Sequence, residues 1–215
     1  SRRSPPGRPR YATMGIKSSP GDGSLDKSEV PTYRVVTLGC RVNQYESESI
    51  GASLQLNGWQ TAEKDEDADL FIINTCTVTA KAAMQSRQAV RQAVREFPDA
   101  AVLVTGCYVQ SDPRVFTQIP GVDYIIGNAD KHRIHEIIAD RGNNRPRRPY
   151  LICSPIRQFR EFPLTALPAV GERARPYLKI QDGCDDFCTY CIVPYTRGPS
   201  RSLPIDAVLE RIDRL

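Results

Sequence analysis

Short apolar runs alternate with amphipathic stretches between residues 33 and 138 of this chain. Runs that are too short for helices and rich in Val, Ile and Leu predict buried strands at residues 33–38, 69–75, 101–106 and 123–127. Helical spacing of the apolar residues in between predicts helices at residues 44–56, 79–96, 113–119 and 131–138. This alternation is typical of an α/β fold with an open, mostly parallel sheet.

The same pattern divides the chain into segments. Residues 1–31 are rich in Ser, Gly, Pro and Arg, and we expect a disordered tail there. Residues 32–140 are expected to form the N-terminal α/β domain, residues 141–172 a linker, and residues 173–215 the beginning of a second domain. No stretch approaches the roughly 18–20 apolar residues of a membrane span, and the N-terminus lacks the apolar run of a secretory signal. We therefore expect a cytoplasmic protein without a membrane partner.

The seven cysteines are the most informative part of the composition. A reducing cytoplasm disfavours disulfides, so an odd number of unevenly spaced cysteines indicates metal ligands or thiol chemistry rather than a disulfide framework. The distribution of charge is less informative. Residues 141–201 carry eleven basic and five acidic side chains. An anionic partner such as RNA and a solvated linker both explain that excess.

Three of the cysteines directly follow predicted strands: Cys40 in "TLGC", Cys76 in "INTC" and Cys107 in "VTGC". The carboxyl ends of parallel strands meet at one edge of the sheet, so these thiols are expected to converge. Structural zinc usually has four protein ligands, whereas three thiolates suit an iron–sulfur cubane with one iron left open. Cys153 has no partner pattern and is expected to be structural.

A second group of three thiols lies in "DGCDDFCTYC", where Cys184, Cys188 and Cys191 have the spacing C-x3-C-x2-C and Tyr190 precedes the last cysteine. With its flanks "LKIQDG" and "IVPYTRG", this stretch resembles the cluster motif of the radical S-adenosylmethionine superfamily. Together with "TLGCRVNQYESE", "INTCTVTAKA" and "VTGCYVQ", it resembles the methylthiotransferases, in which such an α/β domain precedes a radical (β/α) barrel. The motifs are most similar to the branch that modifies N6-threonylcarbamoyladenosine at position 37 of tRNA.

The resemblance implies a role for each motif residue. Cys184, Cys188 and Cys191 would hold a 4Fe–4S cluster that binds S-adenosyl-L-methionine, with Tyr190 near its adenine. Cys40, Cys76 and Cys107 would hold a second, auxiliary 4Fe–4S cluster that carries the sulfur to be delivered. The implied partners are the anticodon loop of tRNA and an electron donor such as flavodoxin or ferredoxin. No side chain is assigned a catalytic role of its own.

Further residues near the motifs are candidates for supporting roles. Arg197 and Arg201, and the basic group Arg145, Arg147 and Arg148, are candidates for phosphate or substrate contacts, although exposed arginines are usually only solvated. Asn43 and Asn74 are candidates for orienting the thiolates by hydrogen bonds, and they are equally ordinary as turn residues.

Alternatives to this function stay open at the level of the sequence. One is an enzyme of the sister branches, which act on isopentenyladenosine in tRNA or on ribosomal protein S12, and which tend to carry "GCQMN" or a "GCPKN"-like stretch in place of "GCRVN". The other is a noncatalytic iron–sulfur or zinc module. A (β/α) barrel needs on the order of 200 residues, yet only 24 follow Cys191. We therefore expect this chain to be an N-terminal piece that is inactive by itself.

Overall fold

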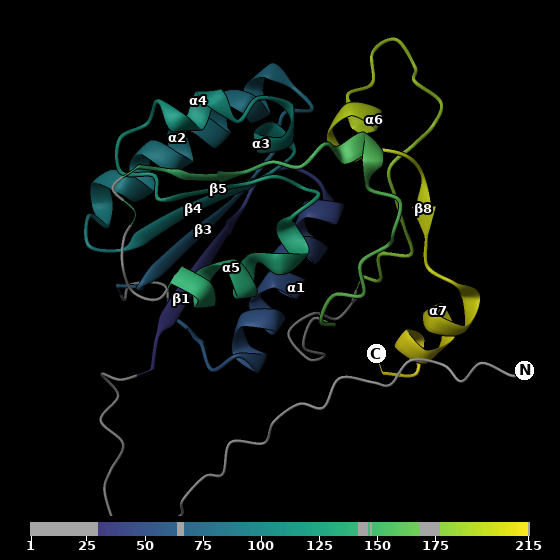
Figure 1. Cartoon of the computed structure of the whole chain (residues 1–215), viewed down its shortest axis with the longest axis horizontal. Helices are drawn as coiled ribbons and strands as arrows, with labels where there is room; N and C mark the ends of the chain where they lie inside the picture. Colours follow the sequence, from purple (N-terminus) through teal and green to yellow (C-terminus); the bar gives the residue numbers. More distant parts are fainter. Residues whose placement is uncertain (1–29, 64–66, 142–145, 147, 168–176, 215) are drawn as a thin grey trace, which may run out of the picture.

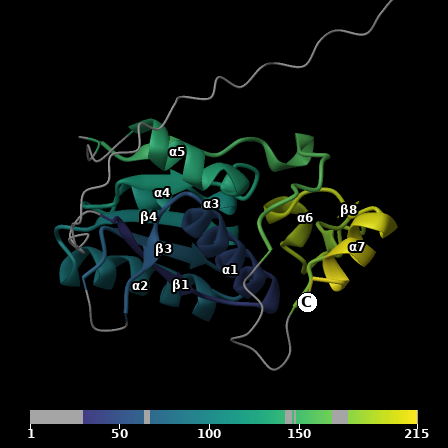
Figure 2. The ribbon, with the colours of Figure 1, turned by 90° about the horizontal axis from the view of Figure 1, so that it is seen from below.

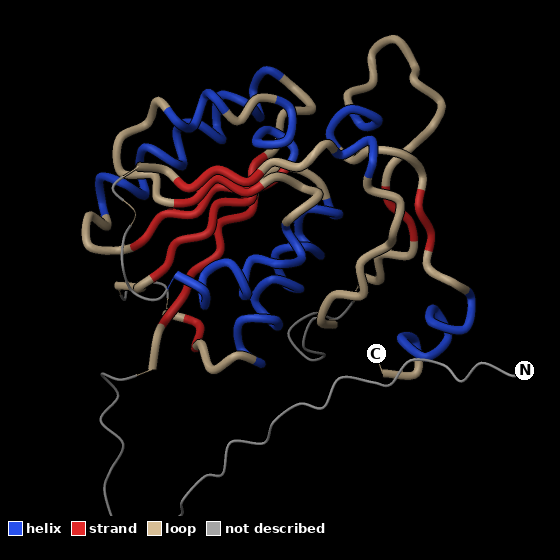
Figure 3. Tube along the Cα trace, in the orientation of Figure 1, coloured by secondary structure: helices blue, strands red, loops and turns tan. Residues whose placement is uncertain are grey.

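The computed structural model describes residues 30–63, 67–141, 146, 148–167 and 177–214. The predicted disordered tail lies almost entirely outside these ranges. Six parallel strands form one sheet in the order β2-β1-β3-β4-β5-β6, seen as the red fan in Figure 3. The strands are β1 (Thr32–Thr37), β2 (Gln60–Thr61), β3 (Leu70–Thr75), β4 (Ala101–Gly106), β5 (Tyr124–Ile126) and β6 (Tyr150–Ile152).

Helices cover both faces of this sheet (Figure 1). On one face lie α1 (Arg41–Leu56), the short 3-10 turn η1 (Lys131–Arg133) and α5 (Ile134–Arg141). On the other lie α2 (Ala80–Glu96), α3 (Cys107–Ser111) and α4 (Arg114–Thr117). Each face has its own apolar core, so the central strands are buried on both sides, as in other covered parallel sheets.

Individual residues explain where these elements begin and what they bury. Every residue of β3 is buried, since its alternate side chains enter the two cores. Helix α2 begins after Thr79, whose side chain accepts a hydrogen bond from the backbone N–H of Ala82. It ends at Glu96, two residues before Pro98, which has no N–H to continue a helix.

The strand order places a topological switch point between β1 and β3. From β1 the chain crosses to β2 on one side, and β3 then pairs with β1 on the other side. In open α/β sheets, ligands bind beyond the carboxyl ends of the strands at such a point. Cys40 follows β1 and Cys76 follows β3, so these two predicted ligands flank the switch point.

A second group of elements lies beside the carboxyl edge of the sheet, and Figure 2 shows it next to the end of α1. It contains β7 (Gln181–Asp182), α6 (Val193–Thr196), β8 (Arg201–Ser202) and α7 (Ile205–Ile212). Strands β7 and β8 pair antiparallel, and two residues separate the end of β8 from the start of α7. The beginning of a (β/α) barrel in this region stays a prediction.

The α/β class and the parallel sheet predicted from the sequence are confirmed. The structure differs in detail, because α1 begins at Arg41 rather than at residue 44, and α3 follows β4 directly. Strand β6 and the short 3-10 turn η2 (Ile156–Gln158) fall in the segment expected to be a linker. Strand β6 pairs with β5, so this segment contributes an edge of the sheet.

In the part of the chain that the structure describes, none of the helices has the length and apolarity that crossing a membrane requires.

Candidate functional site

Three cysteines gather at the carboxyl edge of neighbouring strands. Cys40 directly precedes α1, Cys76 follows β3 without a gap, and Cys107 is the first residue of α3 after β4. Cys76 and Cys107 are buried, each 3% exposed, while Cys40 is exposed. The three strand ends are adjacent because β1 pairs with β3 and β3 with β4. The convergence expected from the sequence therefore follows from the strand order.

Two glycines allow these turns to approach each other. Gly39 has a φ of +93°, and a Cβ there would lie 2.6 Å from the sulfur of Cys76. Gly106 has a φ of +106°, and a Cβ there would lie 2.3 Å from the carbonyl oxygen of Thr75. Both positions combine a backbone conformation that favours glycine with a contact too close for any side chain. The glycines in "TLGC" and "VTGC" therefore bring the cysteine turns together.

The three thiols lie within electrostatic reach of one another. Burial raises the pKa of the Cys76 thiol, and negative charge on Cys107 and on Cys40 raises it further. A hydrogen bond from the backbone of Val78 acts in the opposite direction. Ser86 in α2 fixes the turn, because its hydroxyl accepts from the N–H of Cys76 at 3.1 Å and donates to the carbonyl of Cys76 at 2.9 Å.

The donor set suits an iron–sulfur cluster by its chemistry. Three thiolates are soft ligands of the kind that hold such clusters. In the described ranges, no three His, Cys, Asp or Glu side chains are arranged to hold a single metal ion. A cubane takes each thiolate on a different iron, so it does not require the three sulfurs to meet at one point.

Two asparagines brace the turns through backbone groups. The amide of Asn43 donates to the carbonyls of Leu38 at 2.8 Å and Thr75 at 3.1 Å, which joins the first two cysteine turns. The amide of Asn74 donates to the carbonyl of Asn43 and to the hydroxyl of Ser47, both at 3.0 Å. Neither bonds a sulfur here, so their role in this structure is to hold the backbone rather than to orient thiolates directly.

The second cysteine motif is a loop between the paired strands β7 and β8. The N–H of Cys184 donates to the carbonyl of Gly198 at 3.1 Å, which closes the loop, and the N–H of Cys191 donates to the carbonyl of Cys188 at 2.9 Å. Cys188 is exposed and the other two thiols are partly exposed. Tyr190 is 90% exposed, so its ring faces solvent rather than the protein core.

An aromatic cluster anchors one side of this loop. The ring of Phe187 meets that of Tyr195 edge to face at 5.7 Å between centroids. The guanidinium of Arg157, in η2, lies 5.6 Å from the Phe187 centroid and 5.3 Å from that of Tyr195. Segment 150–158 thus reaches from the sheet to the second cysteine motif.

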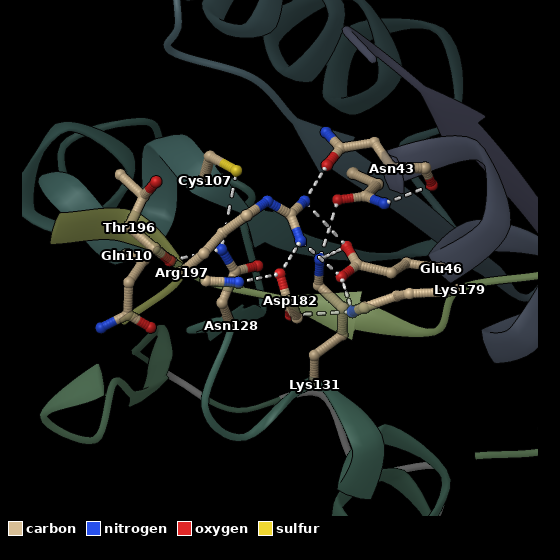
Figure 4. Close-up of polar contacts among 12 residues, drawn as sticks. Asn43, Glu46, Cys107, Gln110, Asn128, Lys131, Lys179, Asp182, Thr196 and Arg197 are labelled. Atoms are coloured by element: carbon tan, nitrogen blue, oxygen red, sulfur yellow. Dashed lines mark hydrogen bonds and ion pairs between the residues drawn. The ribbon is translucent and has the colours of Figure 1, made fainter. Parts of the chain in front are cut away.

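Between the two cysteine sites lies a buried group of six charged side chains, called the ion network below: Glu46, Lys131, Lys179, Asp182, Arg197 and Arg201. Glu46 accepts from the Nζ atoms of Lys131 at 2.6 Å and Lys179 at 2.7 Å (Figure 4). It also accepts from Nη1 of Arg197 at 2.8 Å. Asp182 pairs with Lys179 at 2.8 Å, Arg197 at 3.0 Å and Arg201 at 3.1 Å.

The ion network joins the two cysteine motifs physically. Glu46 belongs to the helix that begins after Cys40, and Arg197 follows Cys191 in the second motif. Arg197 also donates to the side-chain oxygen of Asn43 at 2.7 Å. Burial alone raises the pKa of Glu46, but Arg197, Lys131 and Lys179 outweigh burial and hold that pKa well below its usual value. Glu46 is therefore ionised in the folded chain.

Two of the arginines that were candidates for phosphate or substrate contacts have a different role in this structure. The side chains of Arg197 and Arg201 are only 6% and 3% exposed, and both pair with buried carboxylates. Arg148 is exposed, while Arg145 and Arg147 lie outside the described residues. The sequence analysis missed Glu46, Lys131, Lys179 and Asp182 as site residues. Glu46, Lys179 and Asp182 lie within the recognised motifs, which was an available signal, whereas Lys131 lies outside all of them.

A cavity of about 630 Å³ lies on one side of the ion network. The network residues Glu46, Lys131, Lys179, Asp182 and Arg201 line it, together with side chains of α1, α5, α7 and segment 159–167. Arg197 and Cys107 do not line this cavity. The network therefore has two sides, one toward the cavity and one toward the cysteines at the sheet edge.

Comparison with known proteins agrees with these motifs. The uncharacterized protein family UPF0004 matches residues 32–127, which include Cys40, Cys76 and Cys107. The chain is 39% identical over 179 residues to the threonylcarbamoyladenosine tRNA methylthiotransferase MtaB of Bacillus subtilis, covering 83% of this chain and 39% of that protein. The chain is a relative of the tRNA methylthiotransferases. The resemblance recognised in the sequence is thereby confirmed.

Two further relatives define the range of the similarity. MtaB of Aquifex aeolicus is 35% identical over 83% of this chain and 43% of its own length. The tRNA-2-methylthio-N(6)-dimethylallyladenosine synthase of Pelagibacter ubique is 31% identical over 84% of this chain and 41% of its own length. The chain thus spans about two fifths of the length of these curated relatives.

The close approach at Gly106 predicts a steep cost for a side chain there. Gly106 and Gly58 both have a positive φ, so alanine at either position strains the backbone. Only at Gly106 would the added Cβ also overlap Thr75, because Gly58 has open space around it. We expect Gly58→Ala to lower the free energy of unfolding by about 1–3 kcal/mol through strain. Gly106→Ala should cost a further ~1–3 kcal/mol through overpacking. Urea unfolding of both variants measures the difference, and equal losses would contradict the close approach.

The depressed pKa of Glu46 predicts an acid-dependent part of stability. A carboxylate whose folded pKa is lowered contributes stability above its unfolded pKa, near 4.5, and loses it as the pH falls through the folded value. Glu46→Gln should therefore give an unfolding free energy that falls less steeply below about pH 4.5. At neutral pH the same change should cost about 3–5 kcal/mol, because it leaves buried cations unpaired.

The exposed pair of Glu210 with Arg214, at 64% and 63% side-chain exposure, provides the matched control. Glu210→Gln should change the free energy of unfolding by less than about 1 kcal/mol and leave its pH dependence intact. Urea unfolding of the parent, Glu46→Gln and Glu210→Gln gives the free energy of unfolding at each pH. A range of about pH 3 to 7 covers most of the titration of an ordinary carboxylate. A Glu46→Gln variant with the pH slope of the parent would show that Glu46 does not titrate in this way.

Proposed function

We propose that this chain is the N-terminal part of a tRNA methylthiotransferase that adds a methylthio group to C2 of N6-threonylcarbamoyladenosine at position 37. The observation that carries the proposal is the pair of three-cysteine motifs, one at the switch point of the sheet and one in the β7–β8 loop, joined by a buried ion network. Two relatives at 39% and 35% identity are named for that substrate, and one at 31% is named for dimethylallyladenosine. The higher identity to the relatives that are named for threonylcarbamoyladenosine supports that branch.

The proposal gives each motif a part in holding cofactors. Cys40, Cys76 and Cys107 would hold one 4Fe–4S cluster, and Cys184, Cys188 and Cys191 the other, with S-adenosyl-L-methionine at the second. When bound, these groups supply radical cleavage of a carbon–hydrogen bond and the sulfur that replaces the hydrogen, which side chains alone do not provide. The chain's own residues bind the clusters, fix the cysteine turns and tie the two motifs together.

The form of the substrate favours this chemistry. An aromatic carbon in a stacked base is out of reach of an enzyme, so the base has to leave its stack. Bases of an anticodon loop are already unpaired, which lowers that cost. The exposed Tyr190 and the half-exposed Phe187 in the second motif offer rings at the surface of the loop. Partners under this proposal are tRNA and a low-potential electron donor such as flavodoxin or ferredoxin.

The test uses the full-length protein that contains this segment, expressed in cells whose own threonylcarbamoyladenosine methylthiotransferase gene is deleted. We expect the nucleosides of their tRNA to regain the methylthio form of N6-threonylcarbamoyladenosine, measured by liquid chromatography and mass spectrometry. Cys76→Ala and Cys188→Ala should each abolish the product. Cys153→Ala should retain it, since Cys153 belongs to neither group of three cysteines and its thiol makes only a weak hydrogen bond, to the carbonyl of Val109 at 3.9 Å.

Other outcomes separate the remaining branches. Methylthio groups on isopentenyladenosine, or on ribosomal protein S12, in place of the expected nucleoside would move the enzyme to a sister branch. Full-length protein that loads iron but modifies none of these substrates would favour a noncatalytic iron–sulfur module and would contradict the proposal.

A further inference from the structure

The ion network contains more positive than negative charge. Lys131, Lys179, Arg197 and Arg201 face the two carboxylates of Glu46 and Asp182, and none of the six side chains is more than 11% exposed. In the part of the chain that the structure describes, every ion pair recorded for these cations ends on one of those two carboxylates. Two positive charges are thus buried there without a carboxylate to balance them. A buried charge without a counter-charge is costly, so a negative group nearby is required.

The structure shows which part of the site the excess positive charge faces. Arg197 donates to the side-chain oxygen of Asn43 at 2.7 Å, three residues after Cys40, and Lys131 donates to that of Asn74 at 3.2 Å, two residues before Cys76. The amide of Asn128 lies 3.6 Å from the sulfur of Cys107 and donates to the carbonyl of Thr196, the residue before Arg197, at 2.8 Å (Figure 4). Arg197 is therefore held on the cysteine side of the network.

Arg201 belongs to the other side. It lines the cavity, from which Arg197 is absent, and its partners are Asp182 and the carbonyls of Phe159, Arg197 and Pro199. The two arginines have the same charge and similar burial, and they pair with the same carboxylate. They differ in that Arg197 bonds Asn43 beside the cysteine turns and Arg201 does not, which makes them a matched pair.

We propose that the ion network supplies the counter-charge for an iron–sulfur cluster at Cys40, Cys76 and Cys107, and that Arg197 raises the reduction potential of that cluster. The inference rests on the proposed function, because it takes a cluster to be held by those cysteines. Arg197 is a positioning residue in this role, since it acts through charge and bonds neither substrate nor iron.

Charge counting gives the direction of the effect. A four-iron cluster with three thiolates carries a net charge of about −1 when oxidised and about −2 after it accepts one electron. A fixed cation nearby stabilises the second state more than the first, and burial strengthens this difference. The excess of two positive charges on the network therefore favours the reduced cluster. Removing the Arg197 charge should make reduction harder.

The experiment isolates the auxiliary cluster in the full-length protein. Cys184, Cys188 and Cys191 are replaced by alanine, so that only the cysteines at the sheet edge remain to bind a cluster. The protein is reconstituted with iron and sulfide under anaerobic conditions, and its iron content is determined. The midpoint potential is then measured by titration with dithionite, which donates one electron to the cluster and breaks no protein bond, with electron paramagnetic resonance as the readout.

We expect Arg197→Met to make the midpoint potential more negative by at least about 59 mV, which for one electron is a tenfold change in the reduction equilibrium. Arg197→Lys keeps the charge and should stay close to the parent. Arg201→Met removes an equal charge on the cavity side and should shift the potential by clearly less than Arg197→Met. A merely structural role for Arg197 would not produce this order.

Lys131→Met is a second route to the same result. Should Arg197→Met fail to fold, Lys131→Met should give the negative shift, because the Nζ atom of Lys131 donates to the side-chain oxygen of Asn74 at 3.2 Å, two residues before Cys76. Equal potentials in the parent, Arg197→Met and Lys131→Met, with iron retained, would overturn the inference and leave the proposed function intact. A parent that binds no iron at the three cysteines would overturn both.

Discussion

The carboxylate of Glu46 is the point on which the arrangement of this chain depends. It binds Lys131 after β5, Lys179 before β7 and Arg197 after the second cysteine motif, at 2.6–2.8 Å. These three segments come from different parts of the sequence, and each contributes a buried cation that pairs with Glu46. A lost partner leaves a buried charge unpaired, so the contacts form together or not at all. One side chain thereby sets the position of the second cysteine motif relative to the first.

The parallel sheet provides the other constraint. Its strand order puts the ends of β1, β3 and β4 next to one another, and Gly39 and Gly106 let the turns after them come into contact. The three thiols gather at this edge for reasons of topology, and the ion network brings positive charge to the same edge through Arg197 and Lys131. Fold and electrostatics thus converge on the same place, which is where open α/β sheets bind ligands.

Much of this arrangement was predictable from local sequence. The strands of the central sheet are apolar runs, and a cysteine at the end of each of three successive runs predicts their meeting at one edge. Strand β6 was missed because it is only three residues long, beside Pro149 and within a basic segment that reads as a linker. The two-residue strand β2 is too short to show the alternation of apolar and polar residues that indicates a strand.

The ion network was not predictable in the same way. The pairs that Glu46 makes join residues 85 to 151 positions apart, and no local sequence pattern indicates which distant charges will pair. Arg197 and Arg201 therefore read as exposed arginines, which is the usual state of that residue. Their burial follows from the packing of the β7–β8 loop against the sheet edge, which only the folded chain shows.

The most direct test of the account is the iron content of full-length protein after anaerobic reconstitution. Two four-iron clusters predict about eight irons per chain, falling to about four when Cys40, Cys76 and Cys107 are all replaced by alanine, and likewise for Cys184, Cys188 and Cys191. Iron content that is unaffected by either set of replacements would contradict the assignment of one cluster to each motif.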